Sequence, residues 1–349
     1  MPVYVDPHRD RPGFFWDIVR LSRPLAEVRY RQGRLLGRME GLPLPLREEA
    51  CLGVLTLELV RSAELEGEML PSGQVRAALA GRLGWDCAAH VPAGIDAVGA
   101  AGMLSDVLQR HDQPLTEKRL TEWYMSITPV KQKRLHHLVH YQGPEAQTAP
   151  GLLRSFLKWF NTAADIDPVI KAGVASWWFM TLHPFDRSNG RIARAIADVL
   201  LARADNSGYR FYTLSDMLWK ENEAYIHWMA VARKTPAREA KPDITAFLEW
   251  FLHCLARALS ASEDLHSAVM RKARFWEKHA SVVFNERQRL ILERLLAGVE
   301  PRLTSSYWAR MTVTSSDTAV RDINDLVDKG VLKKDAAGGR STRYVLVEA

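Results

Sequence analysis

Apolar residues at helical spacing dominate the first 280 residues, and this pattern constrains the fold more than any other feature. Within residues 46–66, for example, Leu52, Leu55, Leu59 and Val60 recur every few positions, which places them on one face of a helix. Comparable patterns predict further helices over residues 72–82, 95–110, 115–124, 152–161, 168–182, 189–204, 213–235 and 243–278. The chain is therefore expected to be mainly α.

The residues after 278 follow a different pattern. Three short helices are predicted there, over residues 285–296, 304–310 and 315–329, and a strand–turn–strand pattern follows them. Three helices and a two-stranded wing describe a winged helix-turn-helix. Because 349 residues exceed one ordinary core, we expect three parts: an N-terminal helical region at 1–93, a helical core at 94–280 and this small domain at 283–349.

The predicted recognition helix, residues 315–329, lacks the basic face that neutralising DNA phosphates requires. Its expected exposed residues are Asp317, Arg321, Asp322 and Asp325. The wing is more cationic, with Lys333, Lys334, Arg340 and Arg343. Contact with DNA through the wing, docking of a protein and formation of a homodimer are therefore alternatives that the sequence leaves open.

Composition excludes several classes of protein. With 47% apolar and 25% charged residues, the chain is typical of a globular protein, and no apolar run approaches the roughly 20 residues of a membrane span. The N-terminal residues do not resemble a secretion signal. The cysteines Cys51, Cys87 and Cys254 lie far apart, which argues against a disulfide framework and a zinc site. We expect a cytoplasmic protein with no membrane partner.

The most informative string is LHPFDRSNGRIAR, residues 182–194. Pro184 prevents the apolar helix that ends near His183 from continuing. Asn189 is predicted to cap a new helix. The polar loop between them therefore lies on a helix N-terminus, where unpaired backbone N–H groups form a natural anion site.

Two arginines, Arg191 and Arg194, fall near the start of this new helix and on one face of it. A cation there opposes the helix dipole by roughly 0.3–1 kcal/mol, which is reasonable if an anion lies between the two guanidinium groups. The alternative is two solvated surface arginines. His183, beside the same loop, is a candidate general base rather than an ordinary core histidine.

Residues 182–194 resemble the signature of Fic proteins: His-Pro-Phe, a variable residue, an acid, Gly-Asn-Gly-Arg, two further residues and Arg. The resemblance extends to the whole arrangement of N-terminal helices, helical core with a short β-hairpin flap, and C-terminal winged helix-turn-helix. It implies an enzyme that transfers AMP from ATP to a Ser, Thr or Tyr hydroxyl of a target protein and releases pyrophosphate.

The resemblance also implies a role for each matching residue. His183 would deprotonate the target hydroxyl, and the backbone amides of Asn189 and Gly190 would cradle the α- and β-phosphates. Arg191 would contact the β-phosphate, and Arg194 the γ-phosphate. Farther along the chain, Tyr225 lies where relatives contact the adenosine.

A second string, SAELEG at residues 62–67, matches the inhibitory pattern of many Fic proteins: Ser or Thr, three residues, Glu, then Gly or Asn. The resemblance implies that Glu66 pairs with Arg194 in the place of the γ-phosphate. Ser62 would help to orient Glu66, and Gly67 would end the helix. An ordinary solvated carboxylate is the alternative for Glu66.

Two positions depart from the family signature. Arg187 stands where relatives have the acid that holds Mg²⁺, and an arginine cannot bind a cation. Asp186 is adjacent, but its side chain points in a different direction along the turn. Ser188 replaces a glycine, at a cost of about 1 kcal/mol or more if the position needs a positive φ. Mg²⁺ is therefore a doubtful cofactor.

Residues 125–150 mix β-branched residues with Gly and Pro, which suits a short hairpin or loop. Relatives use this segment as a flap that clamps the target, and here it is abbreviated. His136, His137 and His140 cluster in it, but they have no carboxylate or thiol nearby, so no metal site is predicted.

The sequence thus predicts an autoinhibited protein adenylyltransferase with a degenerate metal-binding position. Besides the residues already assigned roles, Asp186, Arg187 and Ser188 are expected to line the nucleotide site. Arg187 could supply the charge of the missing metal, the donor could differ from ATP, or the site could bind an anion without turnover. The alternative function is therefore a silent or altered-donor core in a nucleotide-binding or DNA-binding regulatory protein.

Overall fold

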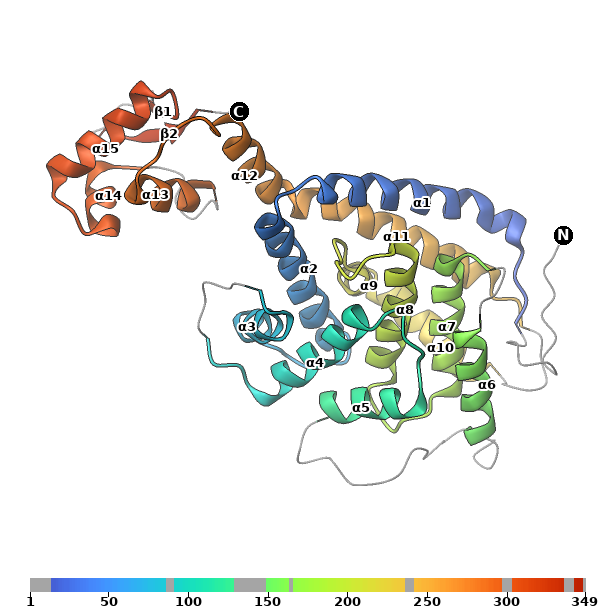
Figure 1. Ribbon diagram of the computed structural model, residues 1–349. Helices are drawn as coiled ribbons and strands as arrows, with labels where there is room; N and C mark the ends of the chain where they lie inside the picture. Colours follow the sequence, from blue (N-terminus) through green and yellow to red (C-terminus); the bar gives the residue numbers. More distant parts are fainter. Residues whose placement is uncertain are drawn as a thin grey trace. The chain divides into compact units, whose positions relative to one another are not determined.

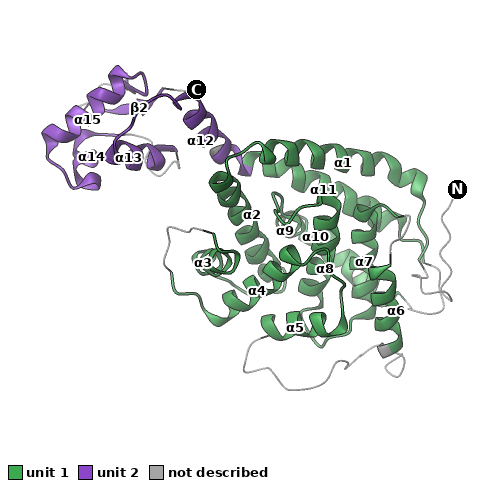
Figure 2. Ribbon diagram, viewed as in Figure 1, with its two compact units in different colours: residues 1–264 green, residues 265–349 purple. Residues whose placement is uncertain are grey.

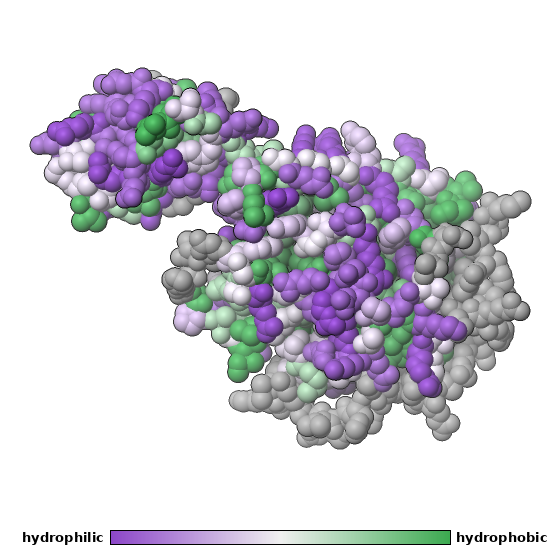
Figure 3. Space-filling view, in the orientation of Figure 1, coloured by the Kyte–Doolittle hydropathy of each residue, from purple (hydrophilic) through white to green (hydrophobic). Residues whose placement is uncertain are grey.

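The computed structural model describes residues 14–85, 91–128, 149–162, 166–235, 242–296, 303–335 and 342–347. The chain divides into two compact units, Met1–Asp264 and Leu265–Ala349, coloured separately in Figure 2. Hydrophilic side chains predominate on the face of the molecule seen in Figure 3. In the described parts of the chain, no helix is both long enough and apolar enough to cross a membrane.

The described part of the first unit is built from helices (Figure 1). Their bounds are α1 Ile18–Glu40, α2 Leu44–Glu64, α3 Ser72–Leu83, α4 Ile95–Gln109, α5 Glu117–Ile127, α6 Ala149–Asn161, α7 Pro168–Leu182, α8 Asn189–Asp205, α9 Leu214–Lys220, α10 Asn222–Lys234 and α11 Thr245–Leu265. The predicted mainly α fold is confirmed.

Helices α7 and α8 pack against each other at the centre of this unit. Every residue of α8 from Asn189 to Ala202 is buried, which is characteristic of a helix enclosed on all sides. Several of these buried residues are polar or charged, namely Asn189, Arg191, Arg194 and Asp198. Because burying such groups is costly unless they find partners, other elements must supply contacts to α8.

Local chemistry explains how α7 begins and ends. The Asp167 side chain accepts a hydrogen bond from the Val169 N–H at 2.8 Å, and Pro168 occupies the first helical position. Proline suits this position because its missing N–H has no partner there. The helix ends at His183, which adopts the left-handed conformation with φ 43°. The loop toward α8 therefore starts at a sharp turn.

Two of the predicted long helices are interrupted. The segment 213–235 divides into α9 and α10 at Glu221, whose carboxylate accepts hydrogen bonds from Trp250 and Arg257. The segment 243–278 divides into α11 and α12 (Ser267–Lys278) at His266. The predicted helix 46–66 runs instead from Leu44 to Glu64.

The predicted flap lies mostly outside the described residues, which stop at 128 and resume at 149. His136, His137 and His140 are among the residues not described, and so is Cys87. The flap stays a prediction.

The second unit contains α12, α13 Glu286–Leu296, α14 Ser305–Thr312, α15 Ser316–Asp328 and the strands β1 Leu332–Lys334 and β2 Tyr344–Leu346. The strands pair antiparallel, with Leu332 opposite Leu346. Phe275 of α12 packs into the core of this unit together with Trp308 and Ile323, so the unit begins before residue 283. The order of three helices and a hairpin matches the prediction, but the winged-helix assignment itself stays a prediction.

The prediction that Asp322 is exposed on the recognition helix is wrong. Asp322 is buried, and its carboxylate accepts hydrogen bonds from Arg287 at 2.7 Å and from Asn285 at 3.0 Å. It joins α15 to the start of α13. The exposed positions of α15 are Ser316, Asp317, Val320, Arg321, Asn324 and Asp328.

Candidate functional site

The loop between α7 and α8 has left-handed residues at both ends, His183 with φ 43° and Ser188 with φ 57°. Ser188, not Asn189, is the N-cap of α8, so the predicted cap is wrong by one residue. Asn189 is instead the first helical residue, and its side chain bridges the loop. It accepts from the Phe185 N–H at 3.1 Å and donates to the Phe185 carbonyl at 2.7 Å.

His183 is half-buried beside Asn189, whose amide nitrogen lies 3.3 and 3.4 Å from the two ring nitrogens. Burial lowers the pKa of His183 below its ordinary value, and the positive charge of Arg233 lowers it further. The imidazole is therefore neutral at pH 7, which is the form that can accept a proton.

Arg194 is only 4% exposed, and its guanidinium donates hydrogen bonds to three residues. Its guanidinium donates to the Ser62 hydroxyl at 3.0 Å and to the Ser62 carbonyl at 2.7 Å. It also donates to Glu66 Oε1 at 3.3 Å and to the Tyr225 hydroxyl at 2.6 Å. Burial alone would lower the pKa of Arg194, but Tyr225 and Glu66 raise it above its ordinary value.

Arg191 is also buried, at 2% exposed. The alternative of two solvated surface arginines is therefore wrong. Arg191 forms an ion pair with Glu68, with 2.7 Å between Arg191 Nη1 and Glu68 Oε2. Its Nε atom is buried with no hydrogen-bond partner in the described residues. Glu68 was missed by sequence analysis.

The Glu66 carboxylate lies directly against the first turn of α8. A Cβ atom added to Gly190 would stand 2.1 Å from Glu66 Oε1 and 3.1 Å from Arg194 Nη1. Glycine at this position therefore allows an anionic group to approach the backbone closely. Gly67, just beyond the end of α2, has φ 75°, so the turn that follows Glu66 also uses a glycine in the left-handed region.

Helix α2 is anchored to the core by a buried acid that sequence analysis did not identify. The Glu58 carboxylate accepts hydrogen bonds from the Thr213 hydroxyl at 2.6 Å and from the Ser215 N–H at 3.0 Å. Nearer the end of α2, Arg61 pairs with Asp216 at 3.1 Å. These contacts to the start of α9 fix the helix that carries Ser62 and ends just before Glu66.

The position that holds a metal ion in the family signature does not fit Mg²⁺. Asp186 is exposed and accepts a hydrogen bond from the Tyr124 hydroxyl, and the Tyr124 ring stacks on Phe185 with 4.6 Å between centroids. Arg187 is exposed as well, and in the described part of the chain no ion pair engages it. No group of three or more His, Cys, Asp or Glu residues that could hold a metal ion occurs among the described residues.

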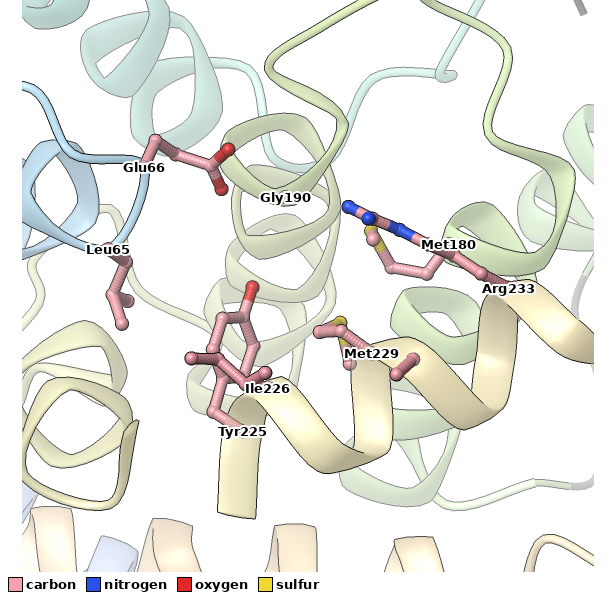
Figure 4. Close-up of a pocket in the computed structure, with 9 residues that line it drawn as sticks. Leu65, Glu66, Met180, Gly190, Tyr225, Ile226, Met229 and Arg233 are labelled. Carbon is pink, nitrogen blue, oxygen red and sulfur yellow. The ribbon is translucent and has the colours of Figure 1, made fainter. Parts of the chain in front are cut away.

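A pocket of about 180 Å³ opens beside the start of α8 (Figure 4). It is lined by Leu65, Glu66, Met180, Gly190, Tyr225, Ile226, Met229, Ala230 and Arg233. In Figure 4 the Glu66 carboxylate and the Arg233 guanidinium both point toward Gly190. Tyr225, Met229 and Arg233 are one helical turn apart along α10, a spacing that could have identified Arg233 from the sequence.

Comparisons with known proteins show which families parts of this chain match. Residues 104–201 match the Fic/DOC family, and residues 4–85 match a domain of unknown function, DUF4172. The proteins named protein adenylyltransferase Fic from Drosophila virilis and Drosophila yakuba are each 24% identical over 172 residues, which is 46% of this chain. The match spans 31% and 30% of those relatives, respectively.

A crystal structure of a Fic family protein from Desulfovibrio desulfuricans G20 has a similar fold, with a TM-score of 0.53 and 17% identity. The likeness covers 94% of this chain and 96% of that one. The chain therefore contains a Fic/DOC domain.

Proposed function

We propose that this protein is an autoinhibited protein adenylyltransferase, which transfers AMP from ATP to a hydroxyl group of a target protein. One observation carries the proposal. Two buried arginines at the start of α8, Arg191 and Arg194, each pair with a carboxylate from the segment after α2. Buried guanidinium groups need an anionic partner, and Glu66 and Glu68 stand where phosphate groups would bind.

The reaction follows from these residues. His183, neutral at pH 7, accepts the proton of the target hydroxyl as the hydroxyl oxygen attacks the α-phosphorus. A new oxygen–phosphorus bond forms, the bond between the α-phosphorus and its leaving oxygen breaks, and pyrophosphate departs. The backbone amides of Asn189 and Gly190, with Arg191 and Arg194, stabilise the negative charge on the phosphates.

The nucleoside would bind in the pocket beside Gly190. Leu65, Ile226 and Met229 offer apolar surface for a base, and binding sites for small molecules commonly combine such surface with a few polar groups. The Tyr225 hydroxyl is engaged by Arg194, so Tyr225 also orients the arginine assigned to the γ-phosphate.

Inhibition is a competition between anions. The Glu66 carboxylate occupies Arg194 and the space against Gly190, so ATP must displace it. Glu68 occupies Arg191 in the same way. Because Glu58 and Arg61 anchor α2, release requires the short segment beyond α2 to move rather than the whole helix.

Labelled ATP tests the proposal. Purified chain is incubated with a lysate as the source of target hydroxyls, and label on protein is measured for the wild type, Glu66→Gly and Glu66→Gly/His183→Ala. We expect Glu66→Gly to label protein and Glu66→Gly/His183→Ala to give no label. Glu64→Gln is the matched control, because Glu64 pairs with Arg61 and not with α8, and it should behave as the wild type.

A second function is favoured by Arg187 and by the left-handed Ser188: a core that binds a nucleotide without turnover, in a protein whose second unit contacts DNA or another protein. Absence of label from Glu66→Gly, with ATP binding retained, would support this function. In that case Glu66→Gly/Arg187→Asp/Ser188→Gly should gain transferase activity, since it restores the acid and the glycine of the family signature.

A further inference from the structure

The proposed nucleotide site carries more arginines than carboxylates, although the position expected to hold a metal ion is occupied by Arg187. In relatives with the family signature, an acidic side chain binds a divalent cation. Here Arg187 stands in the place of that acidic residue. ATP binding still requires positive charge along the whole polyphosphate. Once Glu66 and Glu68 have left, Arg191 and Arg194 are two sources of that charge.

Arg233 is a third source. It lies on α10 and lines the same pocket as Glu66, Gly190 and Tyr225. In Figure 4 its guanidinium points toward Gly190. Its positive charge also lowers the pKa of His183. Arg233 therefore lies close enough to the proposed base to influence its protonation.

Arg233 differs from the other two arginines in one respect. Arg191 and Arg194 are buried and paired with carboxylates. Arg233 is exposed, and within the described ranges of the chain no hydrogen bond or ion pair holds its guanidinium. An arginine in this situation keeps its donors available for a ligand, and a guanidinium binds phosphate oxygens with two parallel hydrogen bonds.

We propose that Arg233 binds the polyphosphate of the nucleotide and thereby makes nucleotide binding independent of a divalent metal ion. The inference rests on the proposed function, because it needs the phosphates to lie at the start of α8. It assigns to a side chain of α10 the charge neutralisation that a metal ion would otherwise supply.

The test is the affinity for ATP, measured by calorimetry on the full chain carrying Glu66→Gly, once with excess EDTA and once with Mg²⁺. We expect the two dissociation constants to agree within about twofold. Adding Arg233→Ala should weaken binding about tenfold or more with EDTA, as expected for loss of a charge-assisted hydrogen bond. Arg233→Lys should recover part of the affinity.

Lys234→Ala provides the matched control. It removes the same charge from the neighbouring exposed position of α10, which points to a different side of the helix, so affinity should stay unchanged. Thermal unfolding midpoints of all variants establish that each is folded. The inference is overturned if Arg233→Ala binds ATP as tightly as Lys234→Ala, or if EDTA alone weakens binding about tenfold.

Arg194→Ala in the Glu66→Gly chain separates this inference from the proposed function. If ATP binding is lost with Arg194→Ala but kept with Arg233→Ala, the role proposed for Arg233 is contradicted and the proposed function is not. Binding that is indifferent to Arg194→Ala, or no binding of ATP by Glu66→Gly, would contradict the proposed function itself.

Discussion

Among single residues, the proposed transfer depends most on His183, which must stay neutral to accept a proton. Burial lowers the pKa of His183 below 6.5, and Arg233 adds to the effect. As the pH falls through this lowered pKa, the imidazole gains a proton and can no longer accept one. In the Glu66→Gly chain we therefore expect the transfer rate to fall with a midpoint below pH 6.5 and to be level above it.

The measurement is the initial rate of labelling from pH 5 to 8. Arg233→Ala removes a positive charge near the ring, so it should move the midpoint toward higher pH. A midpoint above 6.5 in the Glu66→Gly chain would contradict the lowered pKa.

Val313, between α14 and α15, is a second residue with a definite expectation. It is β-branched, 91% exposed and held at φ 52°, a conformation that costs a side chain of this kind about 1–3 kcal/mol. Glycine adopts it freely. Val313→Gly should therefore raise the free energy of unfolding of the second unit by about 1 kcal/mol, measured by denaturant titration.

Val320→Gly is the matched control for Val313. Val320 is also exposed, at 42%, but it lies within α15, where glycine costs roughly 0.5–1 kcal/mol. One valine-to-glycine change should thus stabilise and the other destabilise. If both destabilise the unit, the strain assigned to Val313 is absent.

Among the elements, the segment after α2 places two carboxylates, not one, against arginines at the start of α8, and both are proposed to compete with the nucleotide. The Glu68 side chain is 39% exposed, so its pair with Arg191 is screened by solvent and contributes about 0.5–1 kcal/mol. Glu66→Gly/Glu68→Gln should therefore bind ATP roughly two- to fivefold more tightly than Glu66→Gly alone.

The comparison is made by calorimetry in one buffer, with Glu66→Gly/Glu64→Gln as the control. Glu64 lies close to both carboxylates in the sequence but pairs with Arg61. Equal affinities of the double variants would show that Glu68 does not compete with the nucleotide.

At the scale of the whole molecule, features defined by local chemistry could be predicted from the sequence. The mainly α fold and the turn forced by Pro184 both depend on residues close together in the chain. The helix breaks at Glu221 and His266 could not be predicted, because apolar spacing continues through both and the partners of Glu221 lie in α11.

The sequence did not indicate the roles of residues whose contact partners lie far away in the chain. Glu68 pairs with Arg191, which is 123 residues away in the sequence, and Glu58 accepts a hydrogen bond from Thr213, which is 155 residues away. Asp322 was placed on the exposed face because nothing near it in the sequence indicates its pair with Arg287, 35 positions away. Such contacts depend on how helices pack, which residue spacing alone does not specify.

One anion site at the start of α8 is proposed to hold Glu66 at rest and the polyphosphate of ATP during the reaction. Calorimetric titration of ATP into the wild-type chain and into Glu66→Gly tests this most directly. We predict that Glu66→Gly binds ATP about tenfold or more tightly, since ATP no longer has to displace a carboxylate from Arg194. Equal affinity of the two chains would contradict the claim.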